Sequence, residues 1–331
     1  MGVVKLGDVA RESRLKWTKS KQDIPIVGLE HLIPDEIRFD AYDINTDNTF
    51  SKRFVKGQVL FGRRRAYQRK AAVAEFDGIC SGDITVIEAI EGKMVPELLP
   101  FIIQTPVFFD YANRGSAGSL SPRVKWEHLA DYEFELPSLE EQKVLADKLW
   151  AAYRLKEGYK KLLVATDKMV KSQFIEMFGN SPQKELGELA TFVNGSAFKP
   201  EEWSQEGLPI VRIQNLTQGD APYNYYSGDT SKKVCLNTGD ILVSWSATLG
   251  VFTWSKGPAL LNQHIFKVVF DKLDIEQSFF IYTVKLALEK MADKAHGSTM
   301  RHVVKKDFDS TKVSFPSMRE QQRFVSIAEQ A

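Results

Sequence analysis

The sequence contains few of the residues that build covalent or metal-held frameworks. Among its 331 residues only Cys80 and Cys235 are cysteines, and they lie far apart in mostly apolar runs. This usage predicts two buried, reduced thiols and argues against a disulfide or a metal pair. No apolar run approaches the roughly 20 residues that a membrane span requires, and the N-terminal segment lacks the apolar core of a signal peptide. We therefore expect a cytoplasmic protein.

Motifs of common catalytic and cofactor sites are also absent. The sequence has no G-x-x-x-x-G-K-[ST] phosphate loop, no G-x-G-x-x-G after a strand, and no H-E-x-x-H or paired C-x-x-C. It also lacks an Asn or Asp followed by Pro-Pro and an aromatic residue, the tetrapeptide expected of an adenine methyltransferase. His264, His296 and His302 have the spacing of no common metal site. These absences count against an enzyme and against a metal or cofactor bound by the chain itself.

Charge of one sign is not in excess either. The formal net charge at pH 7 is +1, with 44 Lys and Arg residues against 43 Asp and Glu residues. Any surface for nucleic acid must therefore be a local patch that acidic residues elsewhere balance. The hydrophobic content of 43% is that of a soluble globular protein, and the length fits two domains.

The most informative feature that is present is an internal repeat. LGDVA (6–10) recurs as LGELA (186–190), and IPIVGLEHL (24–32) recurs as LPIVRIQNL (208–216). Three further matches follow in the same order: GQVLF (57–61) with GDILV (239–243), ITVI (84–87) with IFKV (265–268), and FELPS (134–138) with VSFPS (313–317). Because the offsets stay between 179 and 184 residues, we interpret the chain as two copies of one domain type.

Each copy mixes strand and helix signals. Four segments look like a turn followed by a strand or like half-buried strands: GQVLFGRRR (57–65), GDILVSW (239–245), IVRIQNL (210–216) and HIFKVVF (264–270). An amphipathic helix is expected at 276–295, and a broken counterpart at 95–112, where Pro100 and Pro106 limit helix length. Strands without regular alternation with helices indicate an α+β fold.

The segment between the copies predicts one long helix. Residues 138–178 contain no proline, and Ser138 with Glu141 has the spacing of a capping box. About 40 residues at roughly 1.5 Å rise give a helix of about 60 Å. One apolar stripe follows it: Leu145, Leu149, Ala152, Tyr159, Leu162, Thr166, Met169, Gln173 and Met177. Such a stripe needs a partner helix, although packing on one of the globular domains is an alternative.

The first copy contains two candidate DNA-binding segments. Residues 61–70 place five cations and two aromatic rings in ten residues, with further cations just upstream. Arginines there can clamp phosphates or read guanine edges, whereas the alternative is a solvated basic turn. Small residues at 113–126 allow close approach to phosphates, with cations beside them. The candidate residues are Lys52, Arg53, Arg63, Arg64, Arg65, Tyr67, Arg69, Lys70, Arg114, Ser116, Ser119, Arg123 and Lys125.

The second copy has candidates at matching places with different chemistry. Its 296–306 segment again combines Gly-Ser with cations, and SWSATLG (244–250) stands where the first copy has its arginine run. Asn and Gln side chains suit adenine, while a polar rim or a buried amide is the alternative. The candidate residues are Trp245, Ser246, Thr248, Asn262, Gln263, Ser298, Thr299, Arg301, His302 and Lys305. Two similar scaffolds with different surface residues indicate two readers of two different targets.

On these features the whole chain resembles the specificity (S) subunit of type I restriction–modification systems. The resemblance depends on the tandem layout, the LGDVA and LGELA openings, the GQVLF and GDILV strands, and PSLEEQ (137–142) and PSMREQ (316–321) where spacer helices begin. It implies two target-recognition domains, each reading one half of a bipartite double-stranded DNA sequence. Two long antiparallel helices would set the distance between them.

The resemblance also implies partners and cofactors of the complex. Methyltransferase (M) subunits would dock on the chain and modify adenines with S-adenosylmethionine. Restriction (R) subunits would join for translocation and cleavage with ATP and Mg²⁺. None of these cofactors would be bound by this chain.

The expected architecture is therefore α+β, with two target-recognition domains in tandem. We expect them at 1–136 and 180–315, a coiled-coil-forming spacer helix at 137–179, and the start of a second, truncated spacer helix at 316–331. Sixteen residues cannot complete an antiparallel pair. We therefore expect the stripe of the first helix to be covered by the same helix of a second copy, by a separate S fragment, or by M-subunit helices.

Three other functions remain open at the level of sequence. They are a specificity subunit of a related type II system, an enzyme acting on DNA with an unrecognised active site, and a scaffold that has lost DNA binding. The DNA target and the length of its spacer are not predicted.

Overall fold

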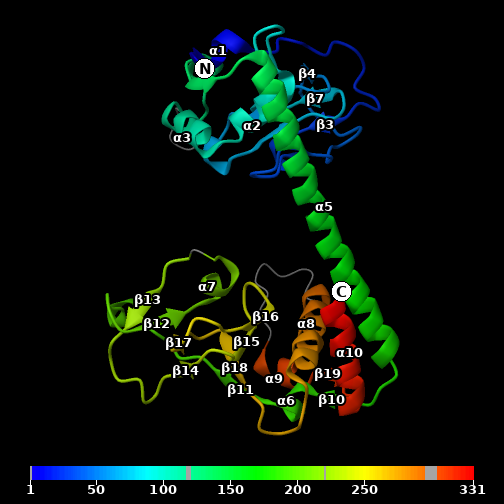
Figure 1. Cartoon of the computed structure of the whole chain (residues 1–331), viewed down its shortest axis with the longest axis vertical. Coiled ribbons are helices and arrows are strands. Elements are labelled where there is room, and N and C mark those ends of the chain that lie inside the picture. The colour runs from blue at the N-terminus through cyan, green and yellow to red at the C-terminus, as the bar shows by residue number, and fades with distance from the viewer. Residues whose placement is uncertain (1, 117–120, 220, 295–303) are drawn as a thin grey trace. The chain divides into compact units, whose positions relative to one another are not determined.

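The computed structural model describes residues 2–116, 121–219, 221–294 and 304–331. They form two compact units, Met1–Tyr159 (unit 1) and Lys160–Ala331 (unit 2). Both units contain helices and strands, in agreement with the expected α+β class (Figure 1). Helix α5, Leu139–Phe178, is continuous and contributes residues to both units (Figure 1). No helix in the described part of the chain is long and apolar enough to cross a membrane.

The larger sheet of each unit has four antiparallel strands in the same arrangement. The order is β2-β8-β5-β6 in unit 1 and β11-β18-β15-β16 in unit 2. The strands are β2 (Ala10–Glu12), β8 (Ile84–Ala89), β5 (Val59–Gly62) and β6 (Ala71–Val73), then β11 (Thr191–Asn194), β18 (Ile265–Val269), β15 (Ile241–Ser244) and β16 (Gly250–Thr253). The strands predicted at GQVLF, GDILV and HIFKVVF are thus present. In both units the GQVLF/GDILV strand pairs with the ITVI/IFKV strand.

A second sheet in each unit is built around one parallel pair. In unit 1 the order is β3-β7-β4, with β3 (Ile26–Val27) parallel to β7 (Gly78–Cys80) and β4 (Lys52–Phe54) antiparallel to β7. In unit 2 the order is β13-β12-β17-β14, with β12 parallel to β17. These strands are β13 (Asn224–Tyr226), β12 (Leu208–Val211), β17 (Ala259–Leu261) and β14 (Cys235–Leu236).

The LGDVA and LGELA repeats begin a third matching structure. In unit 1, β1 (Gly2–Lys5) pairs with β9 (Glu133–Leu136); in unit 2, β10 (Gln183–Glu185) pairs with β19 (Lys312–Ser314). Short helices α1 (Leu6–Val9) and α6 (Leu186–Leu189) follow β1 and β10 and pack on α4 (Trp126–Ala130) and α9 (Lys305–Asp309) respectively. A Cβ on Gly7 would lie 2.9 Å from the Ala130 Cβ, and one on Gly187 would lie 3.2 Å from the Asp309 Cβ. The repeated glycine therefore permits the same close helix contact in each unit.

Prolines and capping residues set where several of the remaining helices begin. The broken helix expected at 95–112 is observed as η3 (Pro96–Leu98), α2 (Leu99–Ile103) and α3 (Pro106–Arg114). Thr105 caps α3 by accepting a hydrogen bond from the N–H of Phe108 at 3.3 Å. The helix expected at 276–295 is α8 (Gln277–Lys294). The other helices are η1 (Leu29–His31), η2 (Ala66–Gln68), η4 (Pro200–Glu202), α7 (Ile213–Thr217) and α10 (Met318–Gln330).

The strand predicted at IVRIQNL is wrong beyond Val211. There the Asn215 Oδ1 atom accepts a hydrogen bond from the N–H of Arg212 at 3.0 Å, and α7 begins. In unit 1, His31 Nδ1 accepts from the N–H of Gly28 at 2.9 Å at the start of η1. A side chain that captures a nearby backbone N–H competes with strand pairing, so the apolar alternation is misleading at this place.

The prediction that both cysteines are buried is wrong for Cys235. Cys80 is fully buried on β7, whereas Cys235 is exposed on β14. Strand β14 is an edge strand, and successive side chains of a strand point to opposite faces. Leu236 therefore takes the buried position, at 1% exposure, and Cys235 faces solvent.

Helix α5 packs on the two units mainly through residues outside the predicted stripe, although the stripe residues Leu149 and Met177 also contact the two cores. Its buried apolar residues are Ala146, Trp150, Tyr153, Val170, Phe174 and Phe178. The stripe residues Leu145, Tyr159, Leu162 and Met169 are instead between 41% and 58% exposed. The ends of the helix are therefore anchored by aromatic side chains, while the exposed stripe residues named here remain accessible.

The PSLEEQ and PSMREQ segments form two capping boxes. The Ser138 Oγ atom donates to Glu141 Oε2 at 2.8 Å, and the Ser317 Oγ atom donates to Glu320 Oε2 at 2.7 Å. Each carboxylate also accepts the backbone N–H of its serine, at 3.0 and 2.9 Å. These hydrogen bonds hold the pKa of Glu141 and of Glu320 below the ordinary value. They position the first turns of α5 and α10.

Candidate nucleic-acid interface

The candidate residues of both units begin at the same place in the fold. Strand β5 ends at Gly62 and is followed by Arg63; strand β15 ends at Ser244 and is followed by Trp245. Arg63 donates its backbone N–H to the carbonyl of Asp83 at 2.9 Å, just before β8. Trp245 donates its backbone N–H to the carbonyl of His264 at 3.4 Å, just before β18. The framework is thus repeated, while the side chains at this edge differ.

In unit 1 the structure joins two candidate segments that are far apart in the sequence. The N–H of Arg65 donates to the carbonyl of Pro122 at 2.9 Å, and the N–H of Val124 donates to the carbonyl of Arg63 at 3.0 Å. Arg64 and Arg123 face each other as an antiparallel bridge. The arginine run and the 121–125 segment therefore form one basic surface, which we call the arginine edge: Arg63, Arg64, Arg65, Arg123 and Lys125.

An acidic residue organises the arginine edge. The Asp83 carboxylate accepts a hydrogen bond from Arg123 Nε at 2.7 Å and lies 3.4 Å from a terminal nitrogen of Arg64. Arg64 Nε also donates to Ser121 Oγ. Burial raises the pKa of Asp83, but the hydrogen bonds and charges of Arg123 and Arg64 outweigh it, so the pKa lies below its ordinary value. The carboxylate thus stays ionised and fixes two guanidinium groups.

The other cations of the edge form no ion pair with the described residues. Among the described residues, Arg63, Arg65 and Lys125 have no ion-pair partner, and the Nε atoms of Arg63 and Arg65 are shielded from solvent without a hydrogen bond. Arg63 and Lys125 line one hollow of about 500 Å³ together with Trp126 and the acidic residues Glu12 and Glu127. Arg65 has a φ of +53°, which turns the chain sharply into η2. Unsatisfied donors at a surface hollow favour a ligand with acceptor oxygens or base edges.

Several other predicted cations of unit 1 have partners inside the unit. Lys52 lies 3.2 Å from Glu12 and donates to the carbonyl of Ile84. Arg53 lies 3.5 Å from Asp77. Two later candidates of unit 1 also have partners within it. Arg69 pairs with Asp35 at 2.7 Å, and Lys70 donates to the carbonyl of Leu29 at 2.7 Å. These interactions support the loops around the arginine edge.

The remaining candidates of unit 1 differ in exposure. Tyr67 on η2 is 58% exposed, so its ring is accessible for stacking. Arg114 is exposed at the end of α3, and Ser116 donates to the carbonyl of Ala112 at 3.2 Å. Ser119 lies outside the described residues.

In unit 2 the same edge is aromatic and polar. The Trp245 ring stacks on Phe266 at 5.6 Å between centroids and lies 5.1 Å from the His264 ring. Buried Ser244 donates to the carbonyl of Thr248 at 2.6 Å, which closes the loop that carries Ser246 and Thr248. Thr248 is exposed, whereas Ser246 is 5% exposed and contributes to the interior of the loop.

Two amides lie beside this loop. Asn262 and Gln263 are held by their backbones: Asn262 donates to the carbonyl of Val211 at 3.1 Å, and Gln263 to the carbonyl of Ser196 at 2.9 Å. In the described part of the chain neither side-chain amide has a hydrogen-bond partner. A Cβ on Gly195 would lie 2.0 Å from the Asn262 carbonyl oxygen, so this loop requires a glycine there. The amides are therefore presented by a fixed backbone.

The basic segment of unit 2 is described in part. Lys305 pairs with Asp309 at 2.6 Å and lies 5.5 Å above the ring of Phe266, on which Trp245 also stacks. The candidates Ser298, Thr299, Arg301 and His302 lie outside the described residues.

The sequence reasoning missed a cation–aromatic cluster in unit 2. Lys233 lies 4.3 Å from the Phe198 ring centroid and 5.2 Å from that of Tyr226, and Arg212 lies 5.4 Å from the Trp203 ring. The run PYNYY (222–226) is the signal that could have indicated it. Asp83 was missed as well, because a single acidic residue in a strand connection has no motif.

One group of side chains in unit 1 has metal-ligand chemistry. The ligand atoms of Glu30, His31 and Asp43 lie within 4.8 Å of one another. His31 Nδ1 accepts the N–H of Gly28, so in the neutral ring Nε2 carries the proton and faces Asp43 at 3.7 Å. This arrangement explains the cluster as a helix cap with an acidic neighbour.

Comparison with known proteins gives one consistent result. Residues 1–163 and 180–330 each match the family described as "Type I restriction modification DNA specificity domain". The EcoBI specificity subunit of Escherichia coli is 25% identical over 138 residues, which cover 41% of this chain and 29% of that protein. The putative MjaX specificity subunit of Methanocaldococcus jannaschii is 21% identical over 92% of this chain and 80% of that protein.

A solved structure shares the fold. The type I restriction–modification S subunit from M. genitalium superposes with a TM-score of 0.57 at 13% sequence identity, covering 99% of this chain and 89% of that one. The fold-level likeness extends over both units. The chain spans 29% of the length of the first E. coli relative, so that protein's full activity does not transfer by similarity alone.

Proposed function

The chain belongs to the type I restriction modification DNA specificity family, and from this premise we propose that it is the sequence-specific DNA-binding subunit of a restriction–modification complex. Unit 1 and unit 2 each read one half of a bipartite target in double-stranded DNA. The chain itself is non-catalytic and works in the cytoplasm.

One observation carries this proposal. Strands β5 and β15 are equivalent, and the residue after each donates its backbone N–H to the carbonyl of the residue just before β8 or β18. At this position unit 1 has Arg63 and unit 2 has Trp245. A repeated framework with different side chains at one edge is expected of two modules that recognise different base sequences. Packing constrains the shared framework, and differences at the edge are where two targets would be distinguished.

In unit 1 we assign the reading role to the arginine edge. Arg63, Arg65 and Lys125 have charges that nothing described in the chain neutralises, so they are available for phosphates or guanine edges. Arg64 and Arg123 are oriented by Asp83. Tyr67 is the exposed ring of this surface.

In unit 2 we assign base reading to polar groups. The amides of Asn262 and Gln263 have the donor and acceptor pattern that pairs with adenine in a major groove. Trp245 and Thr248 lie on the adjoining loop, and Lys305 supplies a cation near it. The candidates at 298–302 belong to the same proposal on sequence grounds.

The partners follow from the same premise. M subunits that use S-adenosylmethionine dock on the chain, and R subunits join for chemistry that uses ATP and Mg²⁺. The accessible stripe of α5, with Tyr159, Leu162 and Met169, supplies an apolar face for a helix of another polypeptide. That polypeptide is an M subunit, a second copy of this chain or a separate S fragment.

Methylome sequencing of a host with and without the gene tests the function directly. We expect the loss of one bipartite adenine-methylated motif when the gene is removed. An unchanged methylome in a host that expresses the M subunit would contradict the proposal. Methylation by the purified chain alone would instead favour an enzyme.

A further inference from the structure

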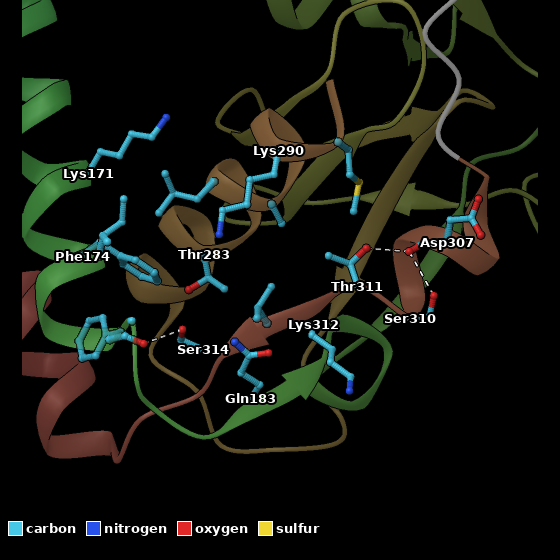
Figure 2. A pocket seen from close by; sticks show the side chains of 17 residues that line it. Lys171, Phe174, Gln183, Thr283, Lys290, Asp307, Ser310, Thr311, Lys312 and Ser314 are labelled. Atoms are coloured by element: carbon cyan, nitrogen blue, oxygen red, sulfur yellow. Dashed lines mark hydrogen bonds between the residues drawn. The ribbon is translucent and has the colours of Figure 1, made fainter. Parts of the chain in front are cut away.

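Unit 2 contains a pocket of about 510 Å³ that has no part in the interface described above. It lies between the C-terminal part of α5, helix α8, and the β10–β19 ribbon with α9 (Figure 2). Its volume is within the range of small-molecule sites, about 300–1,000 Å³. All of its lining residues belong to unit 2.

The walls of the pocket are largely apolar. Phe174 and Phe178 of α5 face Leu286 and Ala287 of α8, and Val313 of β19 contributes from the ribbon. Such a lining suits a hydrocarbon or aromatic body, because burying apolar surface there is favourable. It does not suit the solvated backbone of a nucleic acid.

A buried hydroxyl group lies in the wall of this pocket. Thr283 is 2% exposed, and its Oγ1 atom has no hydrogen-bond partner among the described residues. A buried hydroxyl without a partner costs about 1–3 kcal/mol relative to one that is satisfied. An acceptor atom of a ligand would remove this cost.

Cations line the same pocket. Lys290 is seven residues after Thr283 on α8, so both lie on one face of the helix. Side chains of a helix lean toward its N-terminus, and Figure 2 shows Lys290 extending toward Thr283. Lys171 and Lys312 also line the pocket, and Lys171 is paired with Glu289. Asp307 is the one acidic residue among the lining side chains.

From this geometry we infer that the pocket binds a small organic acid, an apolar body carrying one anionic group. The body fills the space between Phe174, Phe178 and Leu286. The anionic group lies between the ammonium group of Lys290 and the hydroxyl group of Thr283, which both donate hydrogen bonds. The inference concerns a site separate from the arginine edge and does not depend on DNA recognition.

A pair of fluorescent probes tests the inference on the full chain. The sulfonate 1-anilinonaphthalene-8-sulfonate carries the anionic group, and N-phenyl-1-naphthylamine is its uncharged analogue. We expect saturable binding of the sulfonate, with one high-affinity site per chain. Lys290→Gln should weaken the sulfonate about tenfold, as expected for a lost charge-assisted hydrogen bond, and leave the neutral probe nearly unchanged.

Three further variants locate the site. Thr283→Val keeps the shape of the side chain and should weaken the sulfonate selectively. Ile175→Trp, at a pocket residue that is 54% exposed, should exclude both probes. Lys306→Gln removes an exposed cation that does not line the pocket and should change neither affinity. Thermal unfolding of each variant reports on folding.

Clear results would overturn the inference. These are no saturable binding to the wild-type chain, equal sulfonate affinity for wild type and Lys290→Gln, or undiminished binding of both probes to Ile175→Trp. DNA retardation by the same variants separates the two proposals. It should stay unchanged in Lys290→Gln and be weakened when the arginine edge is altered.

Discussion

Gln142 and Gln321 lie 179 residues apart in the sequence and make the same two hydrogen bonds in their own units. Gln142 Oε1 accepts the N–H of Val95 at 2.8 Å, and its Nε2 donates to the carbonyl of Pro137 at 2.9 Å. Gln321 Oε1 accepts the N–H of Glu276 at 3.0 Å, and its Nε2 donates to the carbonyl of Pro316 at 3.0 Å. Both amides are 1% exposed. Gln142 ties the start of α5, and Gln321 the start of α10, to the start of the helical region of its unit.

Replacing Gln321 with Leu should therefore destabilise the protein. The N–H of Glu276 and the carbonyl of Pro316 would lose their partner, at a cost of about 1–3 kcal/mol in the free energy of unfolding. Denaturant unfolding measures this change. The adjacent, exposed Gln322→Leu is the matched control and should change stability little. Equal effects of the two substitutions would contradict the structural role of Gln321.

Substitution of the arginine edge should weaken DNA binding by unit 1. Arg63→Ala and Arg65→Ala should each cost about 1–3 kcal/mol, or roughly 5- to 150-fold in Kd, on the target sequence. If the arginine contacts a phosphate, its loss should reduce the slope of log K against log salt concentration by about one. If it contacts a base, its loss should instead relax the sequence specificity.

Gel retardation across several salt concentrations distinguishes these roles. Arg11→Ala is the control. Arg11 lies on β2, pairs with Glu88 of β8 and is not part of the arginine edge. Retained binding in the triple variant Arg63→Ala, Arg64→Ala, Arg65→Ala would exclude unit 1 as a reader.

The contribution of Asp83 to stability should depend on pH. Its pKa is lowered in the folded state because Arg123 and Arg64 outweigh the effect of burial. A carboxyl group whose pKa is lower in the folded state stabilises the folded protein fully at a pH above its unfolded-state pKa of about 3.9. This contribution is lost as the pH falls through the folded-state pKa. The stability difference between wild type and Asp83→Asn should be constant near neutral pH and shrink below about pH 4.

Because both arginine partners are partly exposed, we expect a difference of about 1 kcal/mol or less at neutral pH. Unfolding free energies measured between acidic and neutral pH check this dependence. Asp47→Asn, at an exposed residue without an ion-pair partner among the described ones, should show no such profile. A difference that grows on acidification would refute the assignment.

The two thiols should differ in reactivity. Burial raises the pKa of Cys80 to about 12, partly offset by the charge of Lys52, so its reactive thiolate is scarce and inaccessible. Cys235 is exposed. A thiol reagent should label one site in the native protein and two in denaturant, and mass spectrometry identifies them. Cys235→Ser should abolish native labelling, and rapid native labelling of Cys80 would show that the strand pairing around β7 is wrong.

The stripe of α5 should be required for association. Leu162→Glu places a charge on the apolar face and should weaken binding of the partner helix, as measured by light scattering with and without M subunits. Val164→Glu is the matched control, because it is similarly exposed but lies two residues away, on another face of the helix. A chain that stays strictly monomeric by itself would exclude self-association and leave an M subunit or S fragment as the partner.

The sequence alone determined the duplicated architecture and the two helix starts. Repeats at a nearly constant offset reflect a framework in which strands, close-packed glycines and capping boxes recur. Each of these features depends on the residue types of one short segment, so the sequence alone can predict it. The absence of proline after the Ser138 cap also predicted the length of α5, although most of the buried residues at its ends lie outside the predicted stripe. Large aromatic residues such as Trp150 and Phe174 decide which face packs, since they bury the most surface.

Only the tertiary structure decided which candidate cations are available and where a ligand pocket lies. Arg63 and Arg69 belong to the same basic run, and nothing in the sequence distinguishes them. In the structure, Arg69 pairs with Asp35, whereas Arg63 lines a hollow beside Lys125. The pairing of 63–65 with 122–124 and the position of Asp83 depend on contacts between distant segments, which no local pattern encodes. The same holds for Thr283, whose unsatisfied hydroxyl becomes meaningful only when α5 and β19 close a pocket around it.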